Sequence, residues 1–102
     1  MIKVYIMHKL KKGATMEDYK EFSPQDQETA RSHPKVKSFR IYQIKGGEGD
    51  EIPFDLVEEL EVENWEVFHE LGKDSNIAKM ERIWLDKYVG NDSLVTFYGE
   101  II

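Results

Sequence analysis

The chain has 102 residues, of which 40% are hydrophobic, and its formal net charge is −6 at pH 7. This length and composition are typical of one domain, residues 1–102, with its own core and no linker. Because acidic residues are spread over the whole chain and the pI is about 5.0, the sequence excludes a basic stripe for nucleic acids or anionic membranes.

Two absences narrow the class of protein further. Without cysteine, disulfides, thiolate metal sites and cysteine nucleophiles are excluded, and the composition fits a reducing compartment. No apolar stretch is long enough for a membrane span or a signal peptide. We therefore expect a soluble, cytoplasmic protein with no membrane partner.

The first predicted strand, residues 2–8, is apolar on both alternating sets, which is typical of a strand buried on both faces. Thr15 is then a plausible N-cap for a helix of about two turns. Ser23-Pro24 interrupts this helix, and we predict a kink or a restart there, with the helical region running to residue 32.

Residues 36–62 form a predicted hairpin, in which strands at 36–44 and 54–62 flank an acidic, glycine-rich turn. Alternation along the second strand places Glu58 within an otherwise apolar face, and Arg40 interrupts the first strand in the same way. Roughly 3–5 kcal/mol is lost when one partner of a buried charge pair is removed. Arg40 and Glu58 are therefore candidates for a pair that shares one sheet face and lines a pocket.

After the hairpin, Asn64 is a predicted cap for a helix over 65–71, which Gly72 ends. Asp74 or Ser75 then starts a further predicted helical segment over residues 76–88. A predicted turn at 90–92 connects this helix to a predicted strand at 94–102.

The order strand, helix, strand, strand, helix, strand is the βαββαβ plan of ferredoxin-like domains. We predict an α+β fold, in which helices cover one face of an antiparallel four-stranded sheet. Since the first and last strands are apolar on both faces, a second copy of the chain is the simplest cover for the other face. We expect a homodimer whose sheets meet face to face, with any ligand cavity on the sheet face opposite the helices.

Several segments carry a resemblance to a known family, and the motifs V-x-S-F-x-x-Y at 36–42 and P-F-D-L-V-E at 53–58 are the most distinctive. Over nearly its full length the chain resembles the dimeric α+β barrel superfamily and, within it, the REDY-like proteins of prodigiosin-type tripyrrole biosynthesis. The resemblance implies a barrel, a dimer and a role near secondary-metabolite assembly. Relatives in the superfamily include cofactor-free monooxygenases and polyketide cyclases, but Leu56 and Glu58 stand here where the cyclases have a third-strand His.

Candidates for acid/base catalysis are His8, Arg40, Glu58 and Tyr42. His8 would point into the cavity near its mouth as a general base, or it is a strand-end histidine. Arg40 would bind an anionic or carbonyl oxygen of the ligand, and Glu58 would either hold the Arg40 guanidinium in place or act as a base of raised pKa. Alternatively, the two residues form an ion pair in the dimer interface. Tyr42 would donate to a ligand carbonyl, or it only lines the barrel.

Candidates for ligand binding are Ile6, Asp26, Leu56, His69, Trp84 and Tyr98. Asp26 would turn its carboxylate toward the pocket, or it stabilises a helix start. His69 is predicted on the helix side away from Trp65 and Phe68, near a helix end that lines the cavity. Trp84, which shares a helix face with Ile77 and Met80, fits a core position better than a cofactor site. We expect no metal and no cofactor, because the three histidines lack ligand spacing and the acids beside the GGEG turn would repel phosphate.

Three functions are compatible with this sequence. The first is a small dimeric protein that binds an aromatic or pyrrolic intermediate, with any catalysis being cofactor-free acid/base work. The second is a cofactor-independent monooxygenase or cyclase. The third is a non-catalytic partner of a pathway enzyme. The first two predict a pocket with convergent polar groups, and the third predicts a filled interior with an exposed apolar patch.

Overall fold

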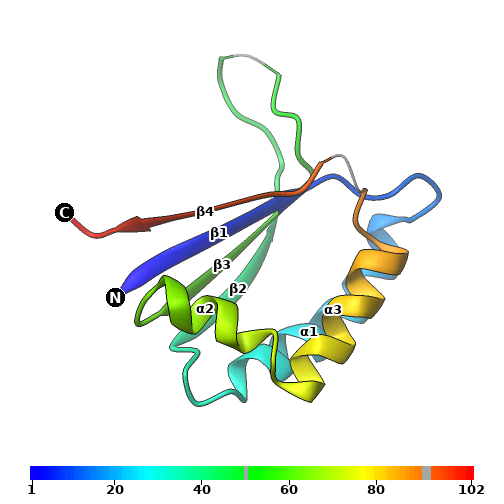
Figure 1. Cartoon of the computed structure of the whole chain (residues 1–102). Coiled ribbons are helices and arrows are strands. Elements are labelled where there is room, and N and C mark those ends of the chain that lie inside the picture. Colours follow the sequence, from blue (N-terminus) through cyan, green and yellow to red (C-terminus); the bar gives the residue numbers. More distant parts are fainter. Residues whose placement is uncertain (50, 91–92) are drawn as a thin grey trace.

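A computed structural model describes residues 1–49, 51–90 and 93–102 and confirms the predicted order of elements. The helices and strands in the described residues are β1 (Ile2–His8), α1 (Met16–Arg31), β2 (Ser38–Gln43), β3 (Leu56–Val62), α2 (Trp65–Leu71), α3 (Ser75–Lys87) and β4 (Val95–Glu100). The strands form one antiparallel sheet in the order β2-β3-β1-β4. All three helices lie on one face of this sheet, which is the ferredoxin-like arrangement (Figure 1).

Three polar side chains fix where the helices begin, as the sequence predicts. The Thr15 hydroxyl accepts a hydrogen bond from the Asp18 backbone N–H at 3.1 Å, and the Asn64 side chain accepts one from Val67 at 2.9 Å. Asp74 accepts two backbone hydrogen bonds at the start of α3. These oxygens satisfy N–H groups that have no partner within the helix.

Helix α1 continues through Pro24, so the predicted restart at Ser23-Pro24 is wrong. Proline removes one backbone donor, which leaves the Lys20 carbonyl without its partner in the helix. This loss is tolerated because Pro24 is exposed and water can reach the freed carbonyl. The Ser23 hydroxyl, which could have capped a new helix, instead accepts a hydrogen bond from the Gln27 side chain at 2.8 Å.

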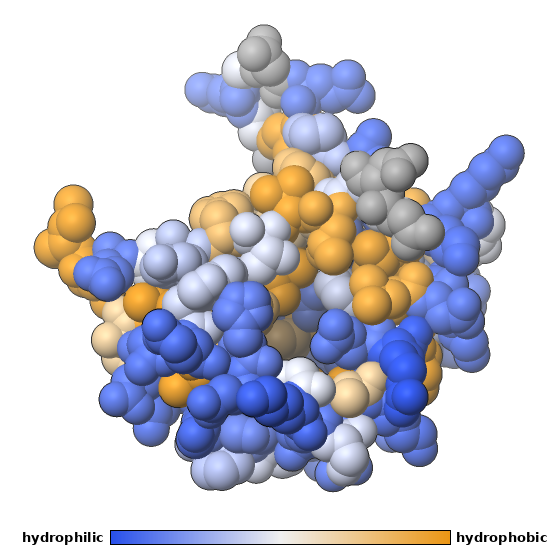
Figure 2. All heavy atoms as spheres, in the orientation of Figure 1, coloured by the Kyte–Doolittle hydropathy of each residue, from blue (hydrophilic) through white to orange (hydrophobic). Residues whose placement is uncertain are grey.

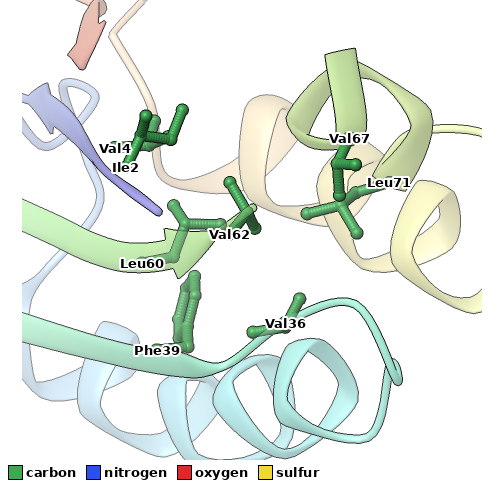
Figure 3. Packing of buried hydrophobic residues seen from close by; sticks show 8 residues of the cluster. All are labelled: Ile2, Val4, Val36, Phe39, Leu60, Val62, Val67 and Leu71. Atoms are coloured by element: carbon green, nitrogen blue, oxygen red, sulfur yellow. The ribbon is translucent and has the colours of Figure 1, made fainter. Parts of the chain in front are cut away.

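The core consists of two clusters on the helix face of the sheet. The larger one joins the sheet to α2 and contains Ile2, Val4, Val36, Phe39, Leu60, Val62, Val67 and Leu71 (Figure 3). The second cluster contains Tyr19, Leu56, Trp84 and Val89. Ile6 and Ile41 contact both clusters, so the space between the two lies over the centre of the sheet.

The opposite face of the sheet has no helix over it. Tyr5 stacks on Phe97 there at 5.3 Å between ring centroids, and Lys3 forms ion pairs with Glu59 and Glu61 at 3.7 and 3.1 Å. The sequence predicts that β4 is buried on both faces, but within one chain every residue of β4 is exposed. A strand with apolar residues on both faces needs a further surface to pack against, and the described part of the chain does not supply one.

Two other features predicted from the sequence concern membrane spans and the turn at 90–92. No helix in the described ranges has the length and apolar content that crossing a membrane would take. The predicted turn at 90–92 lies partly outside the described residues, although the Ser93 backbone N–H donates to the Gly90 carbonyl at 3.0 Å across it.

Candidate functional site

A cavity of about 340 Å³ lies between the sheet and the helices. Figure 2 shows a hollow near the centre of the molecule as viewed there, with apolar side chains at the bottom of the hollow. Helix α1 packs on β2 and on α3, so α3 rests mainly on another helix and leaves space above β1 and β4. The prediction of a cavity on the face opposite the helices is therefore wrong.

The walls of the cavity are mostly apolar. Every strand and helix contributes, together with short connecting segments, and the apolar lining residues are Ile6, Ala30, Phe39, Leu60, Phe68, Leu71, Ile77, Trp84 and Leu94. Such walls exclude water and bind apolar ligands, while a few polar groups set the ligand's orientation.

Carboxyl groups from three different elements enter the cavity: Asp26 from α1, Glu58 from β3 and Glu81 from α3. Glu58 is 5% exposed, and its Oε2 atom has no hydrogen-bond partner among the described residues. Burial raises the pKa of Glu58 well above its usual range, and the negative charges of Asp26 and Glu81 add to this. Burial also raises the pKa of Asp26 to about 6.

Buried polar groups lie behind the cavity wall, where His8 packs against Tyr19 and the lining residue Trp84. In the described residues the buried His8 Nε2, Tyr19 hydroxyl and Trp84 Nε1 have no hydrogen-bond partner. The His8 ring is 5.9 Å from that of Tyr19 and 5.1 Å from that of Trp84. Burial lowers the pKa of His8 and raises that of Tyr19. Each unpaired buried polar group costs about 1–3 kcal/mol, which favours a role in holding a polar ligand or water.

Aromatic rings pack beside Phe68 and His69, two exposed or half-buried lining residues of the cavity. Trp65 stacks on Tyr98 and on Phe68, with ring centroids 4.5 and 5.0 Å apart. The His69 ring lies edge-on to Trp65 at 4.6 Å and to Phe68 at 5.5 Å, and both His69 and Phe68 line the cavity. The prediction that His69 points away from Trp65 and Phe68 is wrong, although His69 does reach the cavity.

The structure brings together some of the predicted site residues. Those that line the cavity are Ile6, Asp26, Glu58, His69 and Trp84. Leu56 does not line it and is buried in the second core cluster with Tyr19 and Trp84. His8 is fully buried and does not reach the mouth of the cavity, because Tyr19 and Trp84 cover its ring. Tyr98 is not among the lining residues; it stacks on Trp65 and is 47% exposed.

Arg40 and Glu58 do not form the predicted pair. The register of β2 and β3 places Arg40 opposite Glu59, and Ile41 opposite Glu58, so the two charges lie on opposite faces of the sheet. Arg40 and Tyr42 both project from the face without helices, and Tyr42 is 42% exposed. A shift of one residue in register exchanges the faces, and the long hairpin loop left this register undetermined by the sequence.

Sequence reasoning missed Tyr19 and Glu81 as members of the site. Tyr19 fits the apolar spacing of α1, so its hydroxyl gave no separate signal. Glu81 lies four residues after Ile77 and three before Trp84, which puts the three on one helix face. This spacing could have identified Glu81 from the sequence as a neighbour of Trp84.

No set of three histidine, aspartate or glutamate side chains within residues 1–49, 51–90 and 93–102 is arranged to hold a metal ion. The chemistry that the described side chains can provide is hydrogen bonding and proton transfer. Two carboxyl groups whose environments give them different proton affinities are suited to acting as an acid and a base.

The chain belongs to the family of the REDY-like protein HapK, whose family model matches residues 2–97. Its fold is similar to the crystal structure of HapK from Hahella chejuensis, at 18% identity and a TM-score of 0.75, covering 100% of this chain and 93% of that one. No curated protein matches the chain.

Other solved structures share the fold at low identity. A crystal structure from Arabidopsis thaliana has 15% identity and a TM-score of 0.82, covering 100% of this chain and 96% of that one. The hydroxynitrile lyase from Passiflora edulis has 10% identity and a TM-score of 0.79, covering 99% and 93%. A dimeric ferredoxin-like protein from Thermobifida fusca has 9% identity and a TM-score of 0.76, covering 98% and 90%.

Proposed function

We propose that this REDY-like protein binds a small aromatic or pyrrolic intermediate in the cavity and acts on it by cofactor-free acid/base chemistry. The observation that carries the proposal is the unpartnered, buried Glu58 carboxyl inside a cavity with apolar walls. The family resemblance supports a place in secondary metabolism, in a pathway of the prodigiosin type. The walls support a ligand with a flat ring system, since Phe39, Phe68 and Trp84 offer flat apolar surfaces.

In this proposal Glu58 acts as the acid and Asp26 acts as the base. Glu58, whose pKa is raised well above its usual range by burial, is suited to donating a proton to a ligand atom. Asp26, whose pKa is about 6, is mainly ionised at pH 7 and accepts a proton from another ligand atom. One carboxyl gains the proton that the other loses, so the step is a tautomerisation that leaves the total number of protons unchanged. The apolar walls keep water from competing for these protons.

Two observations separate this proposal from the alternatives. A non-catalytic partner has no need for an unpartnered carboxyl within a cavity, and a cyclase of the usual type would carry a histidine on β3, where Leu56 and Glu58 stand. A lyase with the same fold supports catalysis by analogy alone.

We also propose that the protein is a homodimer joined through the sheet face that carries Tyr5 and Phe97. Support comes from the exposure of β4 and from the dimeric state of a protein with the same fold. Burial of these rings in an interface would remove a large apolar area from water.

The test of binding uses indole and 2,4-dimethylpyrrole as probes, with ¹⁵N-labelled protein observed by NMR. We expect shifts of the amide signals of Glu58, Ile77 and Thr96, which surround the cavity on three elements. Glu58→Gln should weaken binding about tenfold through the lost hydrogen bond. Glu59→Gln is the matched control, because its side chain lies on the other face of the same strand.

The test of catalysis follows exchange of the pyrrole ring protons for deuterium in D₂O. Protonation of a ring carbon by Glu58 should make this exchange faster with the wild-type protein than with Glu58→Gln. Probes that bind without faster exchange would contradict the catalytic part of the proposal, and a panel in which no probe shifts any cavity amide would contradict the binding part.

A further inference from the structure

We infer that the ligand of this cavity is a planar nitrogen base, bound as a cation through N–H groups that donate to Glu58 and Asp26, and that the cavity rejects carboxylates and phosphates. This inference deepens the proposed function and rests on the cavity being the binding site. It specifies the charge of the ligand, which the apolar walls do not determine.

The charged groups around the cavity favour a cation. Among its described lining residues, the acids are Asp26, Glu58 and Glu81, and neither lysine nor arginine is present. His69 at the rim is the one titratable group there with a basic nitrogen. Behind the wall, His8 is kept neutral by burial, which lowers its pKa. An anion in this cavity would lie among acidic side chains from three elements, without a lysine or arginine of the described lining to offset its charge.

The unpartnered oxygen of Glu58 identifies where the cation binds. Glu58 is 5% exposed, and its Oε2 has no hydrogen-bond partner among the described residues. A nitrogen base that takes the Glu58 proton becomes a cation beside an ionised carboxylate, which then accepts hydrogen bonds from it. A ligand N–H donor would satisfy this oxygen, and a positive charge would also relieve repulsion between Glu58 and Asp26. In the described residues of the free protein no side-chain cation fills this role, which agrees with the raised pKa values of both acids.

The walls require that the cation be flat and delocalised. Phe39, Phe68 and Trp84 contribute ring faces or edges to the lining, and a compact, strongly hydrated ammonium would lose more hydration there than these rings restore. A delocalised cation is weakly hydrated and gains from contact with aromatic faces. A protonated amidine or an aminated heteroaromatic ring has this chemistry.

Three probes of nearly equal shape test the inference by isothermal titration calorimetry: 2-naphthamidine, 2-naphthamide and 2-naphthoate. They carry a positive, a neutral and a negative planar head group on the same rings. We expect the amidine to bind at least about tenfold more tightly than the amide and the naphthoate to show no binding. Below pH 6, protonation of Asp26 should weaken binding of the amidine and leave the amide unchanged.

Variants assign the effect to the carboxyl pair. Glu58→Gln and Asp26→Asn should each weaken the amidine by about tenfold or more and change the amide by less than about threefold, and Glu59→Gln should change neither. The Asp26 variant keeps the test valid if the Glu58 variant does not fold. Equal affinity for all three probes, or tighter binding of the naphthoate, would overturn the inference and leave the binding site standing. A lack of binding by all three would overturn the binding site itself, and the inference with it.

Discussion

Glu58 occupies a position that alternation along β3 reserves for apolar side chains, between Leu56 and Leu60. Its direct neighbours across the sheet are Ile6 and Ile41. An ionised carboxylate at this position would lose most of its hydration, so the folded state favours the protonated form. The pH dependence of stability therefore reports on the site in the absence of any ligand.

The folded protein should lose stability as the pH rises, since Asp26 and Glu58 bind protons more tightly when folded than when unfolded. For Asp26 the stabilisation is complete below its ordinary pKa of 3.8 and is lost as the pH rises to about 6. We expect Asp26→Asn to be about 1–3 kcal/mol more stable than wild type at pH 8 and equal to it near pH 4. Urea unfolding at the two pH values measures this difference.

The exposed aspartate Asp86 on α3 provides the control for this measurement. Asp86→Asn should change stability by less than about 0.5 kcal/mol at either pH. A wild-type protein whose stability rises from pH 4 to pH 8, with Asp26→Asn following in parallel, would contradict the raised pKa of Asp26.

The sequence allowed some residues of the candidate site to be identified and others not. Glu58 was identifiable because an acid among apolar residues of one strand has few structural explanations. Arg40 carried the same kind of signal on β2 but projects from the other face, because a local pattern cannot fix the register across a long loop. Tyr19 was out of reach, since its spacing predicts a core residue and only the fold reveals its unpaired hydroxyl.

At the scale of elements, capping residues predicted boundaries well. Thr15 and Asn64 cap the helices as predicted, and Asp74 is the cap of the two candidates for α3, because capping depends on chemistry within one turn. Pro24 misled the prediction for the opposite reason. Whether a helix ends at a proline depends on what the flanking turns pack against, and α1 packs on both β2 and α3.

Replacing Pro24 by alanine tests the cost of the proline within α1. The change restores a backbone donor for the Lys20 carbonyl, so we expect the free energy of unfolding to rise by about 1–3 kcal/mol, as measured in urea. Gln25→Ala, at the next exposed position, should change it by less than about 0.5 kcal/mol. A loss of stability in Pro24→Ala would mean that the proline sets a geometry of α1 that the packing against its neighbours needs.

For the whole molecule, the apolar patterns of β1 and β4 indicated that the sheet needs a cover on each face. The helices provide one cover, and the proposed partner subunit provides the other. The position of the cavity was not predictable in the same way. It depends on α3 resting mainly on α1 rather than on the sheet, which is a property of packing between elements far apart in the sequence.

The proposed dimer is tested by Phe97→Glu, which places a charge on the uncovered face of the sheet. We expect the mass in solution, measured by light scattering, to fall from about twice 12.0 kDa to 12.0 kDa. The adjacent residue Tyr98 supplies a matched control, because it is equally exposed but lies on the helix face. Tyr98→Glu should remain dimeric, and a monomeric wild-type protein would contradict the proposed dimer.

The cavity is lined by Ile6, near the start of the chain, and by Leu94 and Thr96, near its end, and β1 and β4 pair side by side (Figure 1). Because β4 is an edge strand that pairs only with β1 in the described sheet, the cavity is complete only while these two strands stay paired. Local detachment of β4 would open the cavity while leaving the helices and the other strands in place.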